Sequence, residues 1–513
     1  MSSTSSLTPP GEHDLKTIAE KLNLGCSDED ITAFKKFSAG SHASYEMLDR
    51  MPDMSLPVKY PRTQGYRPSD SENELNAWFY KCEIKGASSG ILSGKRVGIK
   101  DNIAVAGIPM MNGSRTLQSF TPDFDATVVT RILDAGATIV GKTTCENLCL
   151  SGASYVTDYG PVRNPKAKDY SAGGSSSGSA ALVASGEIDM ALGGDQGGSV
   201  RIPASNCGIV ALKPTFGLVP YTGAIPIEST VDHLGPMTQN VHDCALLLQA
   251  IAGNDEKRDH RQPESMSIPN YLEWLSKPTN TLRIGILTEG FNLCKEHVTK
   301  ICEHALEKIK RTAAFASFDK VSVPLHAQAF AIMTPILFEG AVVTMIEGCG
   351  NGTAVPGFMS TSLSDAMFRA TKCHAKEFSP IVKYVMIWTA YMRQRYGNRF
   401  YAKARCYVQK LKAEYDQAFR SYDILVMPTL PIEPCKLPTE DTGLFDYMSN
   451  AVNMISNTSP FNGTGHPALS LNAGYYRNDD GVKLPIGIML VGKRFDDQTV
   501  LQAAAGFEKI LKS

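Results

Sequence analysis

The sequence has almost no net charge, because 51 Lys and Arg residues face 52 Asp and Glu residues over 513 positions. Without a basic excess, nucleic acid or an anionic membrane is disfavoured as the main partner. No apolar run approaches the ~20 residues needed to cross a bilayer. The polar start of the chain also lacks the apolar core of a secretory signal. We therefore expect a cytoplasmic protein that binds neither nucleic acid nor membrane.

Recognisable metal motifs are also missing. The sequence contains no His-Glu-x-x-His motif, and its twelve cysteines are spread singly along the chain. The closest pair, Cys145 and Cys149, has helical spacing, but no histidine or second cysteine pair completes a zinc pattern. We interpret the cysteines as buried, reduced thiols of a cytosolic protein. The sequence thus predicts no metal and no cofactor.

The remaining composition is ordinary, with 43% hydrophobic and 20% charged residues. From Leu92 onwards, short apolar strands alternate with helical patterns, which predicts a three-layer α/β domain around a largely parallel sheet. The segment after Ile209 is rich in Pro and Gly, and we expect it to be mostly loop. The predicted strands are 94–100, 137–141, 282–287, 422–428, 468–472 and 485–491. The predicted helices include 127–135, 143–150, 242–252, 296–312 and 499–511.

Two further regions have helical periodicity and few strand signals. Residues 1–88 are predicted to form an N-terminal helical region, and residues 327–409 a helical insertion or small lobe. The α/β core is then expected in two parts, 89–326 and 410–513. We expect the insertion to contribute to the substrate pocket.

The stretch from Ala172 to Pro203 contains two Gly/Ser turns, which carry Ser175 and Ser199. Taken alone, such a turn is more often a flexible loop, and the phosphate-loop pattern is absent. Lys100 ends an apolar strand, and taken alone it is more often a surface lysine whose stem lies on apolar neighbours.

Amide hydrolysis requires a nucleophile, a base and donors for the oxyanion. No histidine is paired with a nucleophile in a known motif, although His233 and His466 are predicted in loops that could approach a site. A serine activated by a desolvated lysine is the remaining solution.

Three blocks together resemble the amidase signature family: Val97-Gly-Ile-Lys-Asp-Asn102, Gly173-Gly-Ser-Ser176 and Asp195-Gln-Gly-Gly-Ser-Val-Arg-Ile-Pro203. The family pattern is a lysine at a strand end, a Gly-Gly-Ser-Ser block and a Gly-Gly-Ser-apolar-Arg block. The resemblance covers about residues 90–513. It implies an α/β fold with a three-layer α/β/α core, in which the central sheet is mixed.

The resemblance also implies the catalytic roles. Ser199 attacks the amide carbon, Ser175 relays its proton with the Gly174–Ser175 peptide in the cis form, and Lys100 is the base. Ser176 supports Lys100 and Ser175.

The oxyanion is implied to bind backbone N–H groups of the second turn, contributed by Gln196, Gly197, Gly198 and Ser199. Asp195 and Arg201, which flank this turn, are interpreted as a structural brace.

A finer resemblance is to the broad-range bacterial amidases of nitrile-degrading pathways. It is carried by Gln196 within Asp-Gln-Gly-Gly-Ser and by the segments 108–115, 160–164 and 213–224. It implies hydrolysis of small aliphatic or aromatic primary carboxamides to carboxylate and ammonia by a homodimer. Leu150 and Ile225 are candidates for the substrate pocket. The alternatives are a larger amide or an ester, as in indole-3-acetamide hydrolysis, and the amidase component of a tRNA-dependent amidotransferase.

Overall fold

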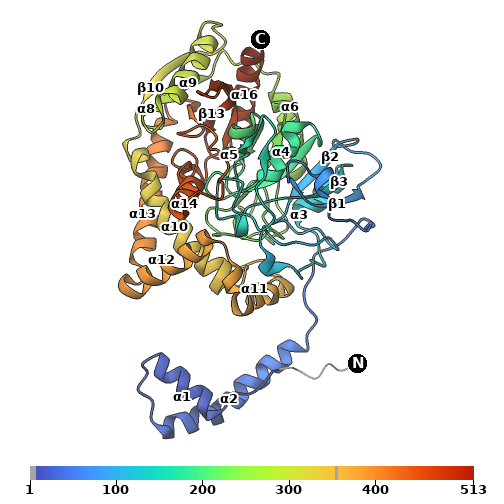
Figure 1. Cartoon of the computed structure of the whole chain (residues 1–513), viewed down its shortest axis with the longest axis vertical. Coiled ribbons are helices and arrows are strands. Elements are labelled where there is room, and N and C mark those ends of the chain that lie inside the picture. The colour runs from blue at the N-terminus through green and yellow to red at the C-terminus, as the bar shows by residue number, and fades with distance from the viewer. Residues whose placement is uncertain (1–6, 353–355) are drawn as a thin grey trace. The chain divides into compact units, whose positions relative to one another are not determined.

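The computed structural model describes residues 7–352 and 356–513 (Figure 1). The chain divides into two units, Met1–Ser55 and Leu56–Ser513. The smaller unit is helical, and the larger unit contains all the strands.

The helical unit consists of α1 (Glu12–Lys21) and α2 (Asp28–Asp49). Ser27 begins α2 as its cap, because its hydroxyl accepts the Asp30 backbone N–H at 3.1 Å. An ion pair of 2.7 Å between Lys16 and Asp28 joins the two helices. Both helices lie within the N-terminal region, 1–88, for which the sequence predicts helices.

The main unit is built on an eleven-stranded sheet with the order β1-β3-β2-β6-β8-β7-β12-β13-β11-β9-β10. The pairs β3–β2, β2–β6, β11–β9 and β9–β10 are parallel, and the other pairs are antiparallel. The mixed sheet implied by the resemblance is therefore confirmed, whereas the largely parallel sheet expected from strand–helix alternation is wrong. The strands are β1 (Trp78–Lys85), β2 (Arg96–Lys100), β3 (Thr138–Thr143), β6 (Met190–Asp195), β7 (Val210–Lys213), β8 (His233–Thr238), β9 (Arg283–Leu287), β10 (Ser317–Val321), β11 (Ile424–Pro428), β12 (Ala468–Arg477) and β13 (Lys483–Gly492).

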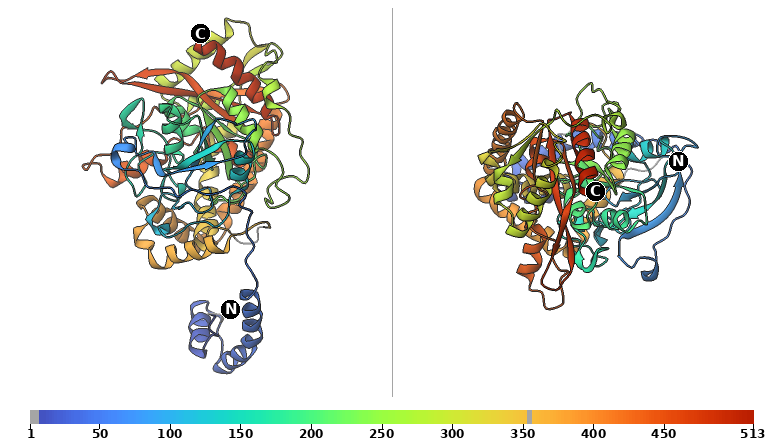
Figure 2. Two further views of the ribbon diagram at one scale, coloured as in Figure 1. Left: turned by 90° about the vertical axis from the view of Figure 1, so that its right-hand side faces the viewer. Right: turned by 90° about the horizontal axis from the view of Figure 1, so that it is seen from above.

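Helices cover both faces of this sheet. The helices α4 and α5 pack on one another and on the strands from β2 to β13, while α6, α9 and α16 pack together on the other face. Figure 2 shows β12 and β13 as a long hairpin beside α16. The helices of the main unit are α3 (Thr127–Asp134), α4 (Ser177–Ser185), α5 (Arg201–Cys207), α6 (Val241–Ile251), α7 (Tyr271–Trp274), α8 (Thr288–Asn292), α9 (Glu296–Lys310), α10 (Ala329–Ala341), α11 (Thr361–Cys373), α12 (Pro380–Tyr396), α13 (Arg399–Ala418), α14 (Leu444–Val452), α15 (Pro460–Thr464) and α16 (Asp497–Lys512).

The small residues of α4 let it lie unusually close to the sheet. A Cβ added to Gly178 would come within 2.6 Å of the Thr144 backbone nitrogen, and one added to Gly193 in β6 within 2.9 Å of Ser176 Oγ. Only glycine fits at such distances. This close packing fixes the first Gly/Ser turn against the ends of β3 and β6.

The helix predicted for residues 143–150 is wrong. Thr143 ends β3, and only a short 3₁₀ turn, Asn147–Cys149, follows. The backbone N–H of Glu146 donates to Ser175, that of Asn147 to Val156, and that of Leu148 to Asn112. These long-range bonds replace the i→i−4 bonds of a helix. Cys145 and Cys149 therefore do not lie on a helix, although their spacing is helical.

The sequence also missed three neighbouring strands in the middle of the sheet, β6, β8 and β7. The strand β7 lies at the start of the segment expected to be loop, and β8 follows it. The sequence of β8, His-Leu-Gly-Pro-Met-Thr, contains a Gly-Pro pair that is typical of turns. Its six residues are all buried between β6 and β7, and this tertiary burial overrides the local signal.

The boundaries predicted for the helical regions differ from the observed elements. The helical unit ends at Ser55 rather than 88, because β1 lies within 1–88 and pairs with β3 at the edge of the sheet. The predicted end of the insertion, 409, falls inside α13. The insertion itself contains α10, α11, α12 and the first half of α13, as its periodicity indicates.

The sequence predicted that no apolar segment is long enough to cross a bilayer, and this prediction needs correction. The segment Pro324–Glu347, which includes α10, is long and apolar enough to cross a membrane by length and composition alone. However, 61% of its most apolar window is buried inside the protein. This is the pattern of a core helix, and several of its side chains line the pocket described below.

Candidate active site

Lys100 and Ser175 are in direct contact at the centre of the main unit. Lys100 is the last residue of β2 and has no exposed surface. Its Nζ donates to Ser175 Oγ at 2.8 Å and to the Gly194 carbonyl at 3.1 Å. The surface-lysine alternative is thus wrong, because the amine is enclosed between the two Gly/Ser turns.

The first turn carries Ser175, which contacts Lys100, and its neighbour Ser176, which bonds to Gly194 instead. The Gly174–Ser175 peptide is cis, as the resemblance implies. The Ser176 hydroxyl donates to the Gly194 carbonyl at 3.2 Å and accepts the Gly194 N–H at 3.3 Å. Ser176 therefore positions the same carbonyl that accepts Lys100.

The second turn follows β6 directly and carries Ser199. The Ser176 N–H donates to the Ser199 carbonyl at 3.2 Å, which joins the two turns. Across residues 7–352 and 356–513, the backbone N–H groups of Gln196, Gly197, Gly198 and Ser199 donate to no protein acceptor. A row of unpaired N–H groups at a Gly-rich turn can bind an anionic oxygen.

A threonine from a distant loop shapes this turn. Thr458 Oγ1 donates to the Gly197 carbonyl at 2.6 Å. Gly198 has a φ of +139° and lies so close to Thr458 that an added Cβ would collide with its Oγ1. Turning the Gly197 carbonyl towards Thr458 leaves the N–H groups of the turn free. The sequence analysis missed Thr458, since nothing local distinguishes it.

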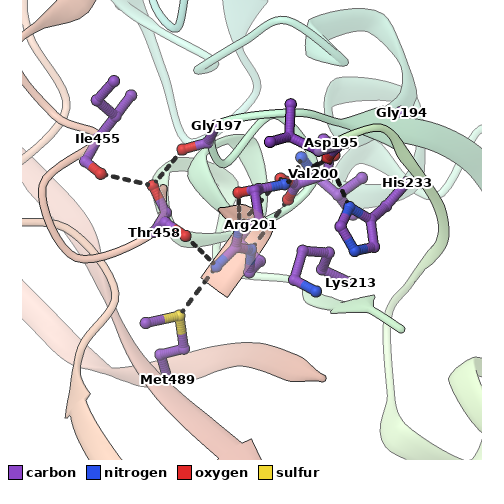
Figure 3. Close-up of polar contacts among 12 residues, drawn as sticks. Gly194, Asp195, Gly197, Val200, Arg201, Lys213, His233, Ile455, Thr458 and Met489 are labelled. Atoms are coloured by element: carbon purple, nitrogen blue, oxygen red, sulfur yellow. Dashed lines mark hydrogen bonds and ion pairs between the residues drawn. The ribbon is translucent and has the colours of Figure 1, made fainter. Parts of the chain in front are cut away.

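Asp195 and Arg201 form a buried ion pair beneath the turn (Figure 3). Arg201 Nε and Nη2 each donate to a different oxygen of Asp195 at 2.9 Å, and Nη1 donates to the Thr458 carbonyl at 2.8 Å. Burial opposes the charge on Asp195, but Arg201 outweighs it and holds the pKa of that carboxyl well below its usual range. Neither residue lines the pocket beside Ser199, which agrees with the interpretation of the pair as a brace.

Ser199 opens onto a pocket of about 730 Å³. Its lining comes mainly from three places: the turn at Leu150, the second Gly/Ser turn, and helices α10, α12 and α14 with the loop that follows. Among the described residues, no Asp, Glu, Lys, Arg or His lines it. The lining residues are Cys149, Leu150, Ser151, Gly152, Gln196, Gly197, Ser199, Ile202, Ile227, Phe330, Thr334, Leu337, Phe338, Ile381, Val385, Ala451, Val452 and Ile455.

Of the two residues that the sequence suggested for the pocket, only one lies in its lining. Leu150 lines the pocket, but Ile225 does not. The Ile225 carbonyl instead accepts the Tyr221 hydroxyl at 3.0 Å, and that hydroxyl in turn accepts Gln196 Nε2 at 2.9 Å. Ile225 thereby helps to fix the Gln196 side chain, a connection that passes through Tyr221 and has no signal in the sequence.

Neither histidine candidate reaches the pocket. His233 begins β8 rather than lying in a loop, and its Nδ1 is 2.7 Å from the Val231 carbonyl. The two ring nitrogens of His466 lie 2.9 Å from Thr464 Oγ1 and 3.1 Å from Asp416 Oδ1. Burial lowers the pKa of both imidazoles. Their contacts assign them a structural role.

A buried carboxyl, Glu146, lies beside the first turn and was not singled out by the sequence. Its Oε2 accepts the Val156 N–H at 3.0 Å, and its Cγ lies 2.8 Å from where a Cβ on Gly174 would be. Burial raises the pKa of this carboxyl to about 7. Glu146 is therefore a carboxyl close to Ser175 that loses its proton near neutral pH.

A buried lysine hydrogen-bonded to a serine beside a pocket can activate a nucleophile on an α/β scaffold. The model of the amidase family matches residues 69–501, and the chain belongs to this family. It is 42% identical over 513 residues to an enantioselective amidase from Rhodococcus rhodochrous, covering 98% of this chain and 96% of that protein. The amidase signature resemblance is thus confirmed.

More distant relatives include a component of the glutamyl-tRNA(Gln) amidotransferase of Haloarcula marismortui, 34% identical over 438 residues, with 84% of this chain and 99% of that protein covered. The solved structure of the corresponding component from Thermotoga maritima matches with a TM-score of 0.70 at 28% identity, covering 85% of this chain and 88% of that chain. These matches confirm the α/β fold.

Proposed function

We propose that this amidase hydrolyses uncharged primary carboxamides with apolar acyl groups, releasing carboxylate and ammonia through Ser199, Ser175 and Lys100. The observation that carries the proposal is the 2.8 Å contact between Lys100 Nζ and Ser175 Oγ, made next to the turn that bears Ser199. It supplies a base and a proton carrier to a serine that faces a pocket.

In the first half of the reaction, Ser199 Oγ attacks the amide carbon while its proton passes to Ser175, whose own proton passes to Lys100. The carbonyl oxygen becomes an oxyanion, which the free N–H groups of residues 196–199 stabilise. The proton returns along the same path to the leaving nitrogen, ammonia departs, and an acyl-enzyme remains. Water then attacks the acyl carbon while Lys100 takes its proton through Ser175. The ester bond to Ser199 Oγ breaks, the proton returns to Ser199 by the same path, and the carboxylate leaves.

The pocket supports the substrate class. Its walls are apolar apart from a few uncharged polar groups, so a charged acyl group would lose hydration without gaining a partner. An alkyl or aryl group gains by burial instead. The same argument disfavours a role in a tRNA-dependent amidotransferase, although several relatives are named as components of one.

A larger amide or an ester is the competing substrate. A panel of acetamide, benzamide, phenylacetamide and indoleacetamide, assayed for ammonia release, distinguishes acyl groups by size. We expect the aromatic amides to give the higher kcat/KM values. Hydrolysis of a matched ester at a much higher rate than every amide would contradict the proposal.

Ser199→Ala tests the nucleophile directly. The variant should lose both ammonia release and covalent labelling by a fluorophosphonate probe, because no acyl-enzyme can form. Ser177→Ala, a change in the same Gly/Ser region at a buried serine that lies outside the pocket, is the matched control. Labelling of another serine in Ser199→Ala would overturn the assignment.

We also propose that the protein is a cytoplasmic homodimer. The helical unit supports self-association, since many of its large apolar side chains are more than half exposed and would be stable against a second copy. These are Ile18, Leu22, Leu24, Phe37, Tyr45, Met47, Leu48, Met51 and Met54.

A further inference from the structure

Two thiols lie next to the lysine–serine contact. Cys145 and Cys149 both donate to Asn112 Oδ1, at 3.7 Å and 3.1 Å. Cys145 is completely buried, whereas Cys149 is 5% exposed and lines the pocket beside Ser199. Hydrolysis as described above requires neither of them.

The turn that carries them directs Cys149 towards the active site. Leu148 and Cys149 have φ values of +50° and +60°, and the Leu148 N–H donates to the Asn112 carbonyl at 2.9 Å. Cys149 shares a small buried cluster with Cys145, and its sulfur lies near the side chains of Ser175 and Lys100. One sulfur is therefore close to both a second thiol and the proton relay.

The two thiols differ in acidity. Burial opposes ionisation of Cys149, but its interactions with Cys145 and Lys100 outweigh burial and lower the pKa of its thiol to about 6. Burial raises the pKa of the Cys145 thiol well above its usual value. A thiolate that is reachable from a pocket and lies beside a neutral thiol is the arrangement that favours oxidation followed by disulfide formation.

We propose that Cys149 is a site of reversible oxidation by peroxides, that Cys145 is its resolving thiol, and that the oxidised enzyme does not hydrolyse amides. The loss of activity rests on the function proposed above; the oxidation itself does not.

The chemistry proceeds in two steps. The Cys149 thiolate attacks one oxygen of the peroxide, the O–O bond breaks, and sulfenic acid forms as the peroxide is reduced to water or an alcohol. The Cys145 sulfur then attacks the Cys149 sulfur, and the S–O bond breaks. The hydroxide that leaves takes up the Cys145 proton as water, and a Cys145–Cys149 disulfide remains. A dithiol reductant returns the disulfide to two thiols by exchange.

Both products disturb the relay. An oxygen on the Cys149 sulfur adds a strong hydrogen-bond acceptor in a buried cluster beside Lys100 Nζ and Ser175 Oγ. A disulfide removes the Cys149 sulfur from its hydrogen bond with Asn112 Oδ1 and constrains the turn that leads to Leu150. Either change alters the geometry on which proton transfer depends.

The test treats the full-length enzyme with hydrogen peroxide and follows three readouts: ammonia release, peptide mass spectrometry of Cys145 and Cys149, and recovery with dithiothreitol. We expect activity to fall at least tenfold in step with a Cys145–Cys149 disulfide and to return on reduction. In Cys145→Ala, the sulfenic acid trap dimedone should label Cys149 instead, and activity should become progressively irrecoverable.

The matched control is Cys207→Ala, which removes a buried thiol that bonds to the Ala172 carbonyl outside the pocket. It should retain the peroxide sensitivity of the parent. Cys149→Ala, measured relative to its own untreated rate, should resist peroxide. Inactivation with both thiols recovered unmodified, or equal peroxide sensitivity in Cys149→Ala, would overturn the proposal.

Labelling of Ser199 by a fluorophosphonate separates this inference from the proposed function. If the disulfide forms in a protein whose Ser199 is never labelled, the oxidation site stands and the proposed mechanism fails. If Ser199 is labelled and peroxide forms no disulfide and no Cys149 sulfenic acid, the mechanism stands and the oxidation site fails.

Discussion

Lys100 acts from the end of a buried strand, where its amine has two acceptors, Ser175 Oγ and the Gly194 carbonyl. Ser176 holds that carbonyl in place from its other side. The position of the proposed base is thus fixed by hydrogen bonds within the two turns, and the proposed relay includes no histidine.

Lys100→Met keeps most of the buried volume and removes the base. We expect kcat/KM to fall by about 10²–10⁴-fold, the usual contribution of a general base, with little change in circular dichroism. Lys95→Met, at a partly exposed lysine that pairs with Asp243 near the start of the same strand, is the control. Near-normal turnover of Lys100→Met would show that another group is the base.

Glu146 makes stability depend on pH. Its pKa is about 7 in the folded protein and 4.5 for a free carboxyl, so the protonated form is favoured by folding. This stabilisation is present below pH 4.5 and is lost as the pH rises through 7. Glu146→Gln should therefore gain stability relative to the parent between pH 4.5 and pH 8, by about 3 kcal/mol.

Urea unfolding at the two pH values measures this difference. Glu440→Gln, at an exposed carboxyl, should show no comparable change. A constant difference between Glu146→Gln and the parent across this range would show that Glu146 is ionised throughout.

At the scale of elements, α10 connects the insertion to catalysis. Its Leu337 Cδ1 lies 3.6 Å from where a Cβ on Gly197 would be, directly over the oxyanion turn. Phe330, Thr334 and Phe338 line the pocket from the same helix. The helix that most resembles a membrane span therefore forms one wall of the pocket that we propose holds the acyl group.

Leu337→Ala should widen that space. We expect the ratio of kcat/KM for a bulky aromatic amide to that for acetamide to rise about tenfold, since removing methyl groups from a hydrophobic pocket changes discrimination by about 1–3 kcal/mol. Ile336→Val changes a buried side chain of α10 that lies outside the pocket, and it should leave the ratio unchanged. An unchanged ratio in Leu337→Ala would exclude this wall from acyl selection.

At the scale of the whole molecule, the helical unit and the main unit form separate sets of contacts. A chain of residues 56–513 should fold with its sheet and pocket intact. If the exposed apolar residues of the helical unit hold the dimer together, this shortened chain should be monomeric by light scattering. A dimer formed by the shortened chain would place the interface on the main unit.

Local sequence was sufficient for elements that carry their own signal. The strands ending at Lys100 and beginning at Arg283 have apolar runs bounded by polar residues, and α3, α6, α9 and α16 have a 3.6-residue period. Local sequence did not predict β8, because burial between two strands overrides its Gly-Pro pair. It also predicted a helix wrongly for residues 143–150, where long-range hydrogen bonds replace helical ones.

The sequence by itself determined the family and suggested the proposed chemistry of the site, because Lys100, Ser175 and Ser199 stand in the three blocks that carry the resemblance. Only the tertiary structure decided what surrounds them. Thr458, Tyr221 and Leu337 reach the site from loops and helices far along the chain, and no local pattern encodes such meetings. Cys149 is another example. Its spacing from Cys145 suggested one face of a helix, but the hydrogen bonds of the turn place its sulfur near Lys100.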